Sequence, residues 1–150
     1  MKNVFLKEVT TDLVDRISAL NIASKATWGT MSVDKMLAHC CVTYEMVYEE
    51  KHSKPNGFVK IFLKLFVKWA VVGDKSYSKN GRTAPQFLIS EPKDFEIEKK
   101  RLIDFLIRTQ KLGANYFEGK ESHSFGRLSS KQWNIMFYKH LDHHLTQFGT

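Results

Sequence analysis

The sequence predicts an all-α protein, a four-helix bundle in which a long crossover connection carries an extra helix. Three observations favour this fold class. Apolar residues recur at helical spacing in several long segments, no segment alternates as a half-buried strand does, and turn-forming residues gather between the helical segments. A chain of 150 residues, 43% hydrophobic and 26% charged, fits a single globular domain over residues 1–150.

Capping residues and apolar stripes predict the first two helices. Thr10 or Thr11 is the expected N-cap of the first helix, and Ser32 is the expected N-cap of the second. The apolar stripe of the first helix is Leu13, Ile17 and Leu20. The apolar face of the second helix is Val33, Met36, Leu37, Cys40, Tyr44 and Val47. The stretch "HSKPNG" then breaks the helical pattern.

The next segment, "FVKIFLKLFVKWAVV" at residues 58–72, is strongly apolar but carries a lysine stripe. Lys60, Lys64 and Lys68 recur every four residues, which places them on one side of a helix that ends at Gly73. The run is too short to span a bilayer. We expect an amphipathic helix packed on the bundle; the alternative is a cationic helix that lies on a membrane surface.

Turn-forming residues dominate residues 73–92, and a connection of this length in a small domain often crosses the bundle. Asp94 can cap the following helix, which should end at Gly113. The buried stripe of this helix is Phe95, Leu102, Ile103, Leu106 and Ile107.

A second loop leads to the last helix. Ser129 opens it, and Gln132 three residues later completes a capping-box pattern. Gly149 stands where a C-terminal cap belongs.

Charge and cysteine usage set limits on partners and location. The formal net charge is +7, but lysines are spread along the chain and no nucleic-acid-binding motif is present, so we expect no nucleic-acid partner. Cys40 and Cys41 are adjacent and fit reduced thiols. The stretch "MKNVFLKEVTTD" lacks the apolar core of a signal peptide. These features predict a cytoplasmic protein without a membrane partner.

Three of the six histidines lie in "YKHLDHHLTQFGT". On a helical wheel, His144 falls near the centre of the apolar face of the last helix, and His140 lies about 40° away on the same side. His143 lies at the margin, roughly 100° from His144, and is a candidate to line the pocket beside the ligands. Residues four apart have Cβ atoms about 5–6 Å apart, which lets two imidazoles converge on one metal ion. The alternative is a pair of core histidines hydrogen-bonded to protein groups.

A third ligand is predicted on a facing helix. His39 lies at the margin of the second helix's apolar face, and helical bundles build metal sites from inward side chains on facing helices. Gln147, one turn beyond His144, could hydrogen-bond a ligand or a bound water, or be an exposed helix-end residue. Thr43, one turn beyond His39, could line the pocket. His52 and His123 are expected to be solvated in loops.

No general base stands out. Glu45 and Glu49 point away from His39 by helical count, and Asp142 projects away from His144, so each is expected to be a solvated or capping residue. Three aromatic residues of the crossover region could wall a pocket or serve as core and loop anchors: Trp69, Tyr77 and Phe87.

The chain resembles the DinB/YfiT-like superfamily of metalloenzymes. The resemblance lies in His39 within "TWGTMSVDKMLAHC" and in His140 and His144 within "FGRLSSKQWNIMFYKHLDHHLTQFG", which looks especially like a subgroup of small bacterial proteins of unknown function. It covers both ends of the chain and is weak over about residues 52–93.

This resemblance implies a single DinB-like bundle domain and a divalent metal ion, zinc or nickel, held by the three histidines. It also implies a small-molecule substrate, either in transfer or isomerisation with a low-molecular-weight thiol or in hydrolysis, and a homodimer. The alternative is a bundle that binds a metal or a ligand without catalysis.

Overall fold

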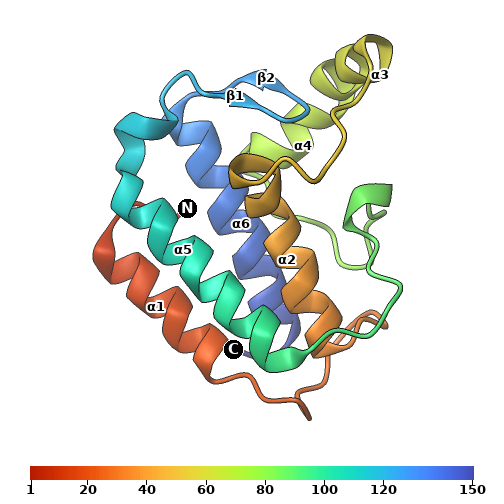
Figure 1. Cartoon of the computed structure of the whole chain (residues 1–150), viewed down its shortest axis with the longest axis vertical. Coiled ribbons are helices and arrows are strands. Elements are labelled where there is room, and N and C mark those ends of the chain that lie inside the picture. Colours follow the sequence, from red (N-terminus) through yellow and green to blue (C-terminus); the bar gives the residue numbers. More distant parts are fainter.

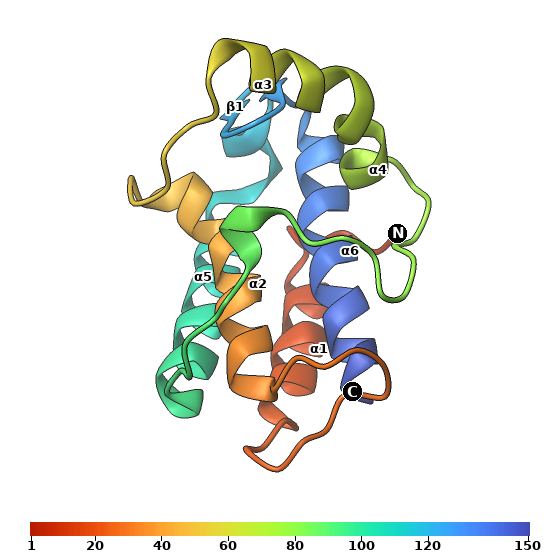
Figure 2. The same ribbon diagram turned by 90° about the vertical axis from the view of Figure 1, so that its right-hand side faces the viewer.

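Four long helices lie side by side in the computed structural model, which describes residues 1–150 (Figure 1). They are α1 (Lys7–Ser18), α2 (Val33–Tyr48), α5 (Phe95–Phe117) and α6 (Ser130–Gln147). Figures 1 and 2 show that α2 and α5 run in one direction and that α1 and α6 run in the opposite direction. The prediction of an all-α protein is confirmed.

The core between these helices is rich in aromatic rings. Tyr44 of α2 stacks on Phe137 of α6 with ring centroids 5.0 Å apart, and Phe117 of α5 meets Phe137 at 5.4 Å. Cys40 and Cys41 are buried and unpaired, and burial raises the pKa of both thiols. The cysteines therefore act as small apolar residues rather than as nucleophiles.

A long crossover joins the parallel helices α2 and α5. It contains α3 (Gly57–Phe62), a π-helical turn η1 (Leu63–Val67), α4 (Lys68–Val72) and a short 3₁₀ turn η2 (Pro85–Phe87). Figure 2 shows the chain after α4 crossing in front of α6 and then α2 before it reaches α5. Two parallel helices need a connection that returns along the bundle, and this one covers the face between α2 and α6.

The lysine-striped segment is helical and ends at Gly73, but it does not pack its apolar face on the bundle. Phe58 is 90% exposed and Trp69 is 80% exposed, whereas Val72 at the end of α4 is buried. The expectation of a packed amphipathic helix is therefore wrong. The four long helices already fill the core, so only the end of α4 finds a place against α6. No helix of the protein is both long enough and apolar enough to cross a bilayer.

Lys139 of α6 fastens the end of α4. Its amino group donates to the carbonyl oxygens of Ala70 (2.9 Å), Gly73 (2.6 Å) and Lys75 (3.1 Å). Burial lowers the pKa of Lys139. A cation at a helix C-terminus is favourable because it meets the last, otherwise unbonded carbonyls.

The observed starts of the helices agree only in part with the N-cap residues predicted from the sequence. α1 begins at Lys7 rather than after Thr10 or Thr11, and the Thr10 hydroxyl donates to the Val4 carbonyl (2.8 Å) instead of capping the helix. Ser32 stands at the N-cap position of α2 but its side chain makes no capping hydrogen bond. The Asp94 side chain caps α5 by accepting from the Ile97 backbone N–H.

Both termini of the last helix, α6, agree with the prediction. Ser129 and Gln132 form the capping box at its start, and Gly149 follows its end with φ +79°. Gly113 does not end α5: the chain turns there with φ +70°, which favours glycine, and the helix resumes to Phe117.

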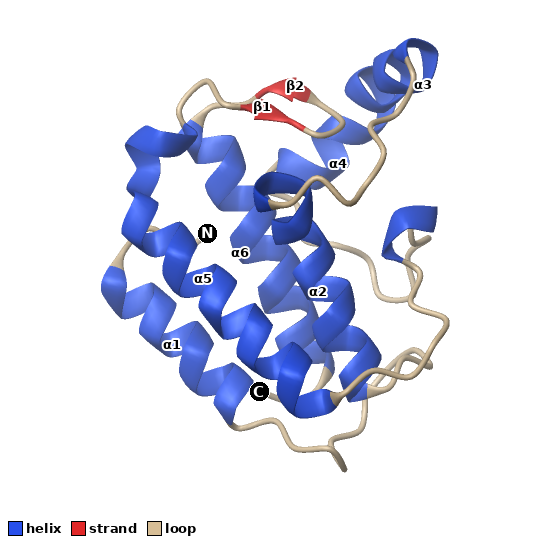
Figure 3. Cartoon of the chain, viewed as in Figure 1, coloured by secondary structure: helices blue, strands red, loops and turns tan.

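The loop after α5 contains a short antiparallel pair, β1 (Glu121–Ser122) and β2 (Gly126–Arg127) (Figure 3). The sequence did not predict these strands, because two residues are too few to show an alternating pattern.

Candidate metal centre

Three histidines from two helices meet beneath the crossover. His39 comes from α2, and His140 and His144 come from successive turns of α6; one ring nitrogen of each lies within 4.8 Å of the others. The Nε2 atoms of His39 and His140 are 2.8 Å apart. The rings of His39 and His144 lie 4.6 Å apart, centroid to centroid. The structure thus brings together the three residues that the sequence placed in one site.

Hydrogen bonds fix the orientation of two of these rings. The Nδ1–H of His39 donates to the Phe87 carbonyl oxygen (2.9 Å), and the Nδ1–H of His144 donates to the Gln147 side-chain oxygen (2.8 Å). A neutral imidazole that carries its hydrogen on Nδ1 has its lone pair on Nε2. Both rings therefore present an unprotonated Nε2 nitrogen, as a metal ligand must.

The third ring, His140, contacts Thr43, whose Oγ1 lies 3.0 Å from His140 Nδ1. In the contact between the two Nε2 atoms, His140 must carry the hydrogen, since His39 already has its own on Nδ1. The Thr43 hydroxyl then donates to His140 Nδ1. A cation between the Nε2 atoms would require the other tautomer, and the same hydroxyl can accept from Nδ1–H. Thr43 therefore suits His140 as a metal ligand.

The environment of the cluster keeps the imidazoles neutral. Burial lowers the pKa of His39, and burial together with the neighbouring imidazoles lowers the pKa of His140 well below its ordinary value. Burial and His39 lower the pKa of His144 to about 3. Metal binding requires deprotonated ligands, and neutral imidazole nitrogens suit zinc and nickel. The donor set therefore fits a divalent ion of this kind.

Gln147 links this cluster to the loop before α2. Its amide nitrogen donates to the Trp28 carbonyl oxygen (2.7 Å), and its backbone carbonyl accepts from Thr27 N–H (2.8 Å). Gly29 has φ +78°, and a Cβ there would lie 3.0 Å from the Gln147 amide nitrogen. Gln147 is buried and positions the His144 ring, so the alternative of an exposed helix-end residue is wrong.

His143 lies beside the cluster but outside it. The side chain is half-buried, and its ring packs edge-on against Trp28 and Tyr77, each at 5.7 Å between centroids. Burial lowers its pKa. His143 thus joins an aromatic contact rather than the set of converging nitrogens.

Two of the three aromatic residues considered as pocket walls flank the histidines. The Phe87 ring lies 5.3 Å from His39 and 5.7 Å from His140, and the Tyr77 ring lies 6.4 Å from His140. Burial raises the pKa of Tyr77 to about 12, so the phenol stays protonated at neutral pH. Trp69 is instead exposed on α4.

The carboxylates considered as general bases are bound to cations elsewhere. Asp142 accepts from Arg16 (2.8 Å), and Glu45 accepts from His52 (2.7 Å) and from Arg101. Glu45 is buried and His52 is half-buried, so the expectation that both are solvated is wrong. His123 is also half-buried, and its Nε2 lies 3.3 Å from the His52 carbonyl oxygen.

The sequence did not predict two backbone groups that contribute to the site. The carbonyl groups of Phe87 and Trp28 hold His39 and Gln147, and a backbone carbonyl leaves no mark in a residue pattern. The glycine of "TWGT" is a partial signal, because a glycine often marks a close approach to a backbone.

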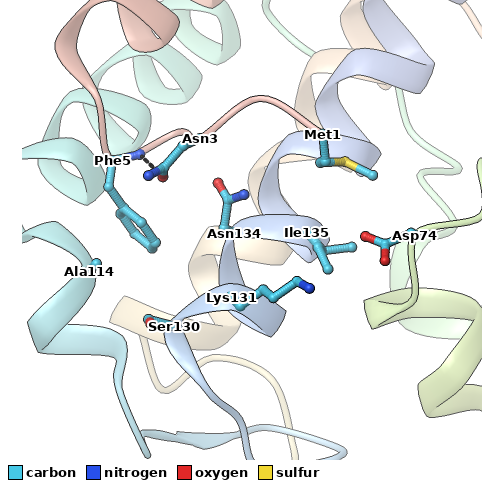
Figure 4. A pocket seen from close by; sticks show the side chains of 9 residues that line it. All are labelled: Met1, Asn3, Phe5, Asp74, Ala114, Ser130, Lys131, Asn134 and Ile135. Carbon is cyan, nitrogen blue, oxygen red and sulfur yellow. Dashed lines mark hydrogen bonds between the residues drawn. The ribbon is translucent and has the colours of Figure 1, made fainter.

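A separate open pocket of about 470 Å³ lies among the N-terminal residues and the start of α6. Figure 4 shows Asn3, Asn134 and Lys131 around it, with the Phe5 backbone N–H bonded to the Asn3 side chain (3.1 Å). No histidine lines this pocket, so it is distinct from the metal centre.

Thr43 supplies a prediction about the cluster. Replacing Thr43 with valine keeps the side-chain shape but removes the partner of His140 Nδ1, so we expect zinc affinity to fall about 10–100-fold. Competition titration against a chromophoric chelator measures this change. Thr43→Ser retains a hydroxyl and should stay within a few-fold of wild type; equal affinity of the valine variant and wild type would show that Thr43 does not support the ligand.

The fold and the site define a mostly helical protein with a buried three-histidine cluster that could hold a metal ion. Residues 7–150 match the family described as "Protein of unknown function (DUF1569)", and the chain belongs to that family. No curated protein matches the chain, and no solved structure matches it either.

Proposed function

We propose that the chain is a metal-dependent enzyme of the DinB-like type, which binds zinc or nickel through His39, His140 and His144. The reaction is either the transfer of a low-molecular-weight thiol to a small molecule or the hydrolysis of a small molecule. The convergence of three neutral imidazole nitrogens from α2 and α6 carries this proposal. The long crossover between parallel helices also agrees with a DinB-like bundle.

The donor set favours catalysis over a purely structural role. Closed zinc sites use four protein ligands, whereas three protein ligands leave a position for a water or a substrate. A divalent ion held there would lower the pKa of a bound water towards 7 or stabilise a thiolate. The chain itself supplies the positioning: Phe87, Thr43 and Gln147 hold the three rings, and no protein carboxylate competes for the ion.

The second candidate is a bundle that binds a metal or a ligand without turnover. The bonded state of the acidic residues favours it, because Glu45 and Asp142 are held by Arg101 and Arg16 and cannot act as general bases at the histidines. If the protein is a metal-dependent enzyme, its turnover would therefore depend on the metal ion and on functional groups of the substrate.

One experiment separates the two candidates. Protein purified without a nickel column is loaded with zinc or nickel and assayed with glutathione, bacillithiol and mycothiol against an electrophilic acceptor, and with activated esters in water. We expect turnover that depends on the metal, is lost in His39→Ala and is retained in His143→Ala. Stoichiometric metal without thiol- or water-dependent turnover would favour the non-catalytic bundle.

A further inference from the structure

The helical part of the crossover, residues 57–72, carries an apolar face that the rest of the protein leaves uncovered. Phe58 is 90% exposed, Phe66 is 69% exposed and Trp69 is 80% exposed. Other exposed apolar residues extend this face: Val59, Ile61, Phe62 and Leu65. Figures 1 and 2 show α3 at the end of the bundle near the β1–β2 pair. Large contiguous apolar patches on a folded protein mark interaction sites.

The same segment is uniformly cationic. Residues 51–73 contain five lysines and no acidic side chain. Lys60, Lys64 and Lys68 recur at every fourth residue, so they follow one another along the segment beside its apolar residues. Lys60 bonds to Glu121 (2.7 Å), while Lys64 is exposed and makes no ion pair. The face therefore joins aromatic and aliphatic residues to a flank of positive charge.

We propose that this face binds the surface of an anionic lipid bilayer, with the helical segment lying in the plane of the membrane. Phenylalanine, leucine and tryptophan on one side and lysine on the other are the composition of interfacial helices. Tryptophan prefers the headgroup level, and lysine side chains reach the phosphate groups. The segment is shorter than the roughly 20 residues that a spanning helix needs, so it rests on the bilayer.

A second copy of the chain is a poorer occupant of this face. Self-pairing across a two-fold axis would bring the same lysine-rich segment of each copy together, and like charges repel. An anionic lipid surface supplies both the apolar depth and the opposite charge. This proposal replaces the sequence-based expectation of no membrane partner.

Vesicle co-sedimentation tests the proposal. Wild-type protein should sediment with vesicles of phosphatidylglycerol and phosphatidylcholine at low salt, and high salt should weaken the binding. Vesicles of phosphatidylcholine alone should bind much less protein. A triple variant replaces exposed residues of the face with serine: Phe58, Phe66 and Trp69. Its partition should fall at least tenfold, because each large side chain contributes burial in the bilayer.

A matched control replaces three exposed apolar residues elsewhere with serine: Ile22, Leu88 and Ile97. This control should bind as wild type does. The double variant Lys64→Gln/Lys68→Gln should lose roughly fivefold in partition per lysine with anionic vesicles. Trp69 adds a local readout, since its fluorescence should shift to the blue on binding and Trp69→Phe should lose that shift while still sedimenting.

Three results would overturn the proposal: no sedimentation of the wild type with anionic vesicles, equal partition of the triple serine variant and its matched control, or dimerisation through this face without vesicle binding. Sedimentation velocity on the same samples reports dimerisation.

Discussion

Replacing His144 with alanine is expected to abolish stoichiometric binding of zinc or nickel. His144 supplies one of the three converging nitrogens, so its removal leaves only two protein ligands in the cluster. Loss of a direct ligand should weaken affinity by more than the roughly 10–100-fold that loss of an outer hydrogen-bonding partner costs. Elemental analysis of protein purified without a nickel column gives the stoichiometry, and chelator competition gives the affinity.

The neighbouring histidine provides the matched control. His143 is adjacent in sequence, carries the same side chain and lies on the same helix, but its ring packs on Trp28 and Tyr77 outside the cluster. His143→Ala should therefore keep most of the metal, and His140→Ala should lose it as His144→Ala does. Equal loss from all three substitutions would mean that the ion is not held in the arrangement described, while equal retention would remove the metal site altogether. Circular dichroism shows whether each variant is folded.

The metal centre was predictable from the sequence because helical geometry relates residue numbers to directions. A spacing of four in α6 selects His140 and His144 over His143, and His39 lies at the margin of the apolar face of α2, from which it can reach a facing helix. Thr43 and Gln147 followed from the same count, one turn from a ligand each. The partners Phe87 and Trp28 did not follow, since their carbonyl groups reach the site only through the path of a loop.

The sequence predicted a helix in the crossover correctly, but the prediction that this helix packs its apolar side on the bundle was wrong. An amphipathic pattern fixes which residues share a side of a helix, but it does not say whether that side faces the core or the solvent. In this chain the long helices fill the core, and the apolar side of the segment from Phe58 to Trp69 faces outwards. Likewise, helical count and loop position left Glu45 and His52 as solvated residues. Glu45 is buried where it accepts from Arg101 of α5, and a local pattern does not reveal a contact between residues so far apart in the chain.

Glu45 ties α2 to α5 and to the loop after α2, and its removal should destabilise the protein. Its side chain is only 8% exposed and accepts from Lys51 (2.9 Å), His52 (2.7 Å) and Arg101. Breaking a buried ion pair costs about 3–5 kcal/mol, and the partial exposure of Arg101 reduces this, so we expect Glu45→Ala to lower the free energy of unfolding by roughly 2–3 kcal/mol at pH 7. Urea unfolding measures the loss. Glu49→Ala, at a less buried carboxylate, should change it by about 0.5 kcal/mol or less.

The same carboxylate should make stability depend on acid pH. Burial by itself raises the pKa of Glu45, but the hydrogen bonds from His52, Lys51 and Arg101 outweigh it, and the pKa lies below the ordinary 4.5. The unfolded chain then binds the proton more tightly than the folded one, so the stabilisation is complete above pH 4.5 and is lost as pH falls through the folded pKa. Glu45→Gln has no such group to titrate. Between about pH 5 and pH 3 the wild type should therefore lose more free energy of unfolding than Glu45→Gln does, whereas parallel curves would show that the Glu45 carboxylate is not stabilised by its three partners.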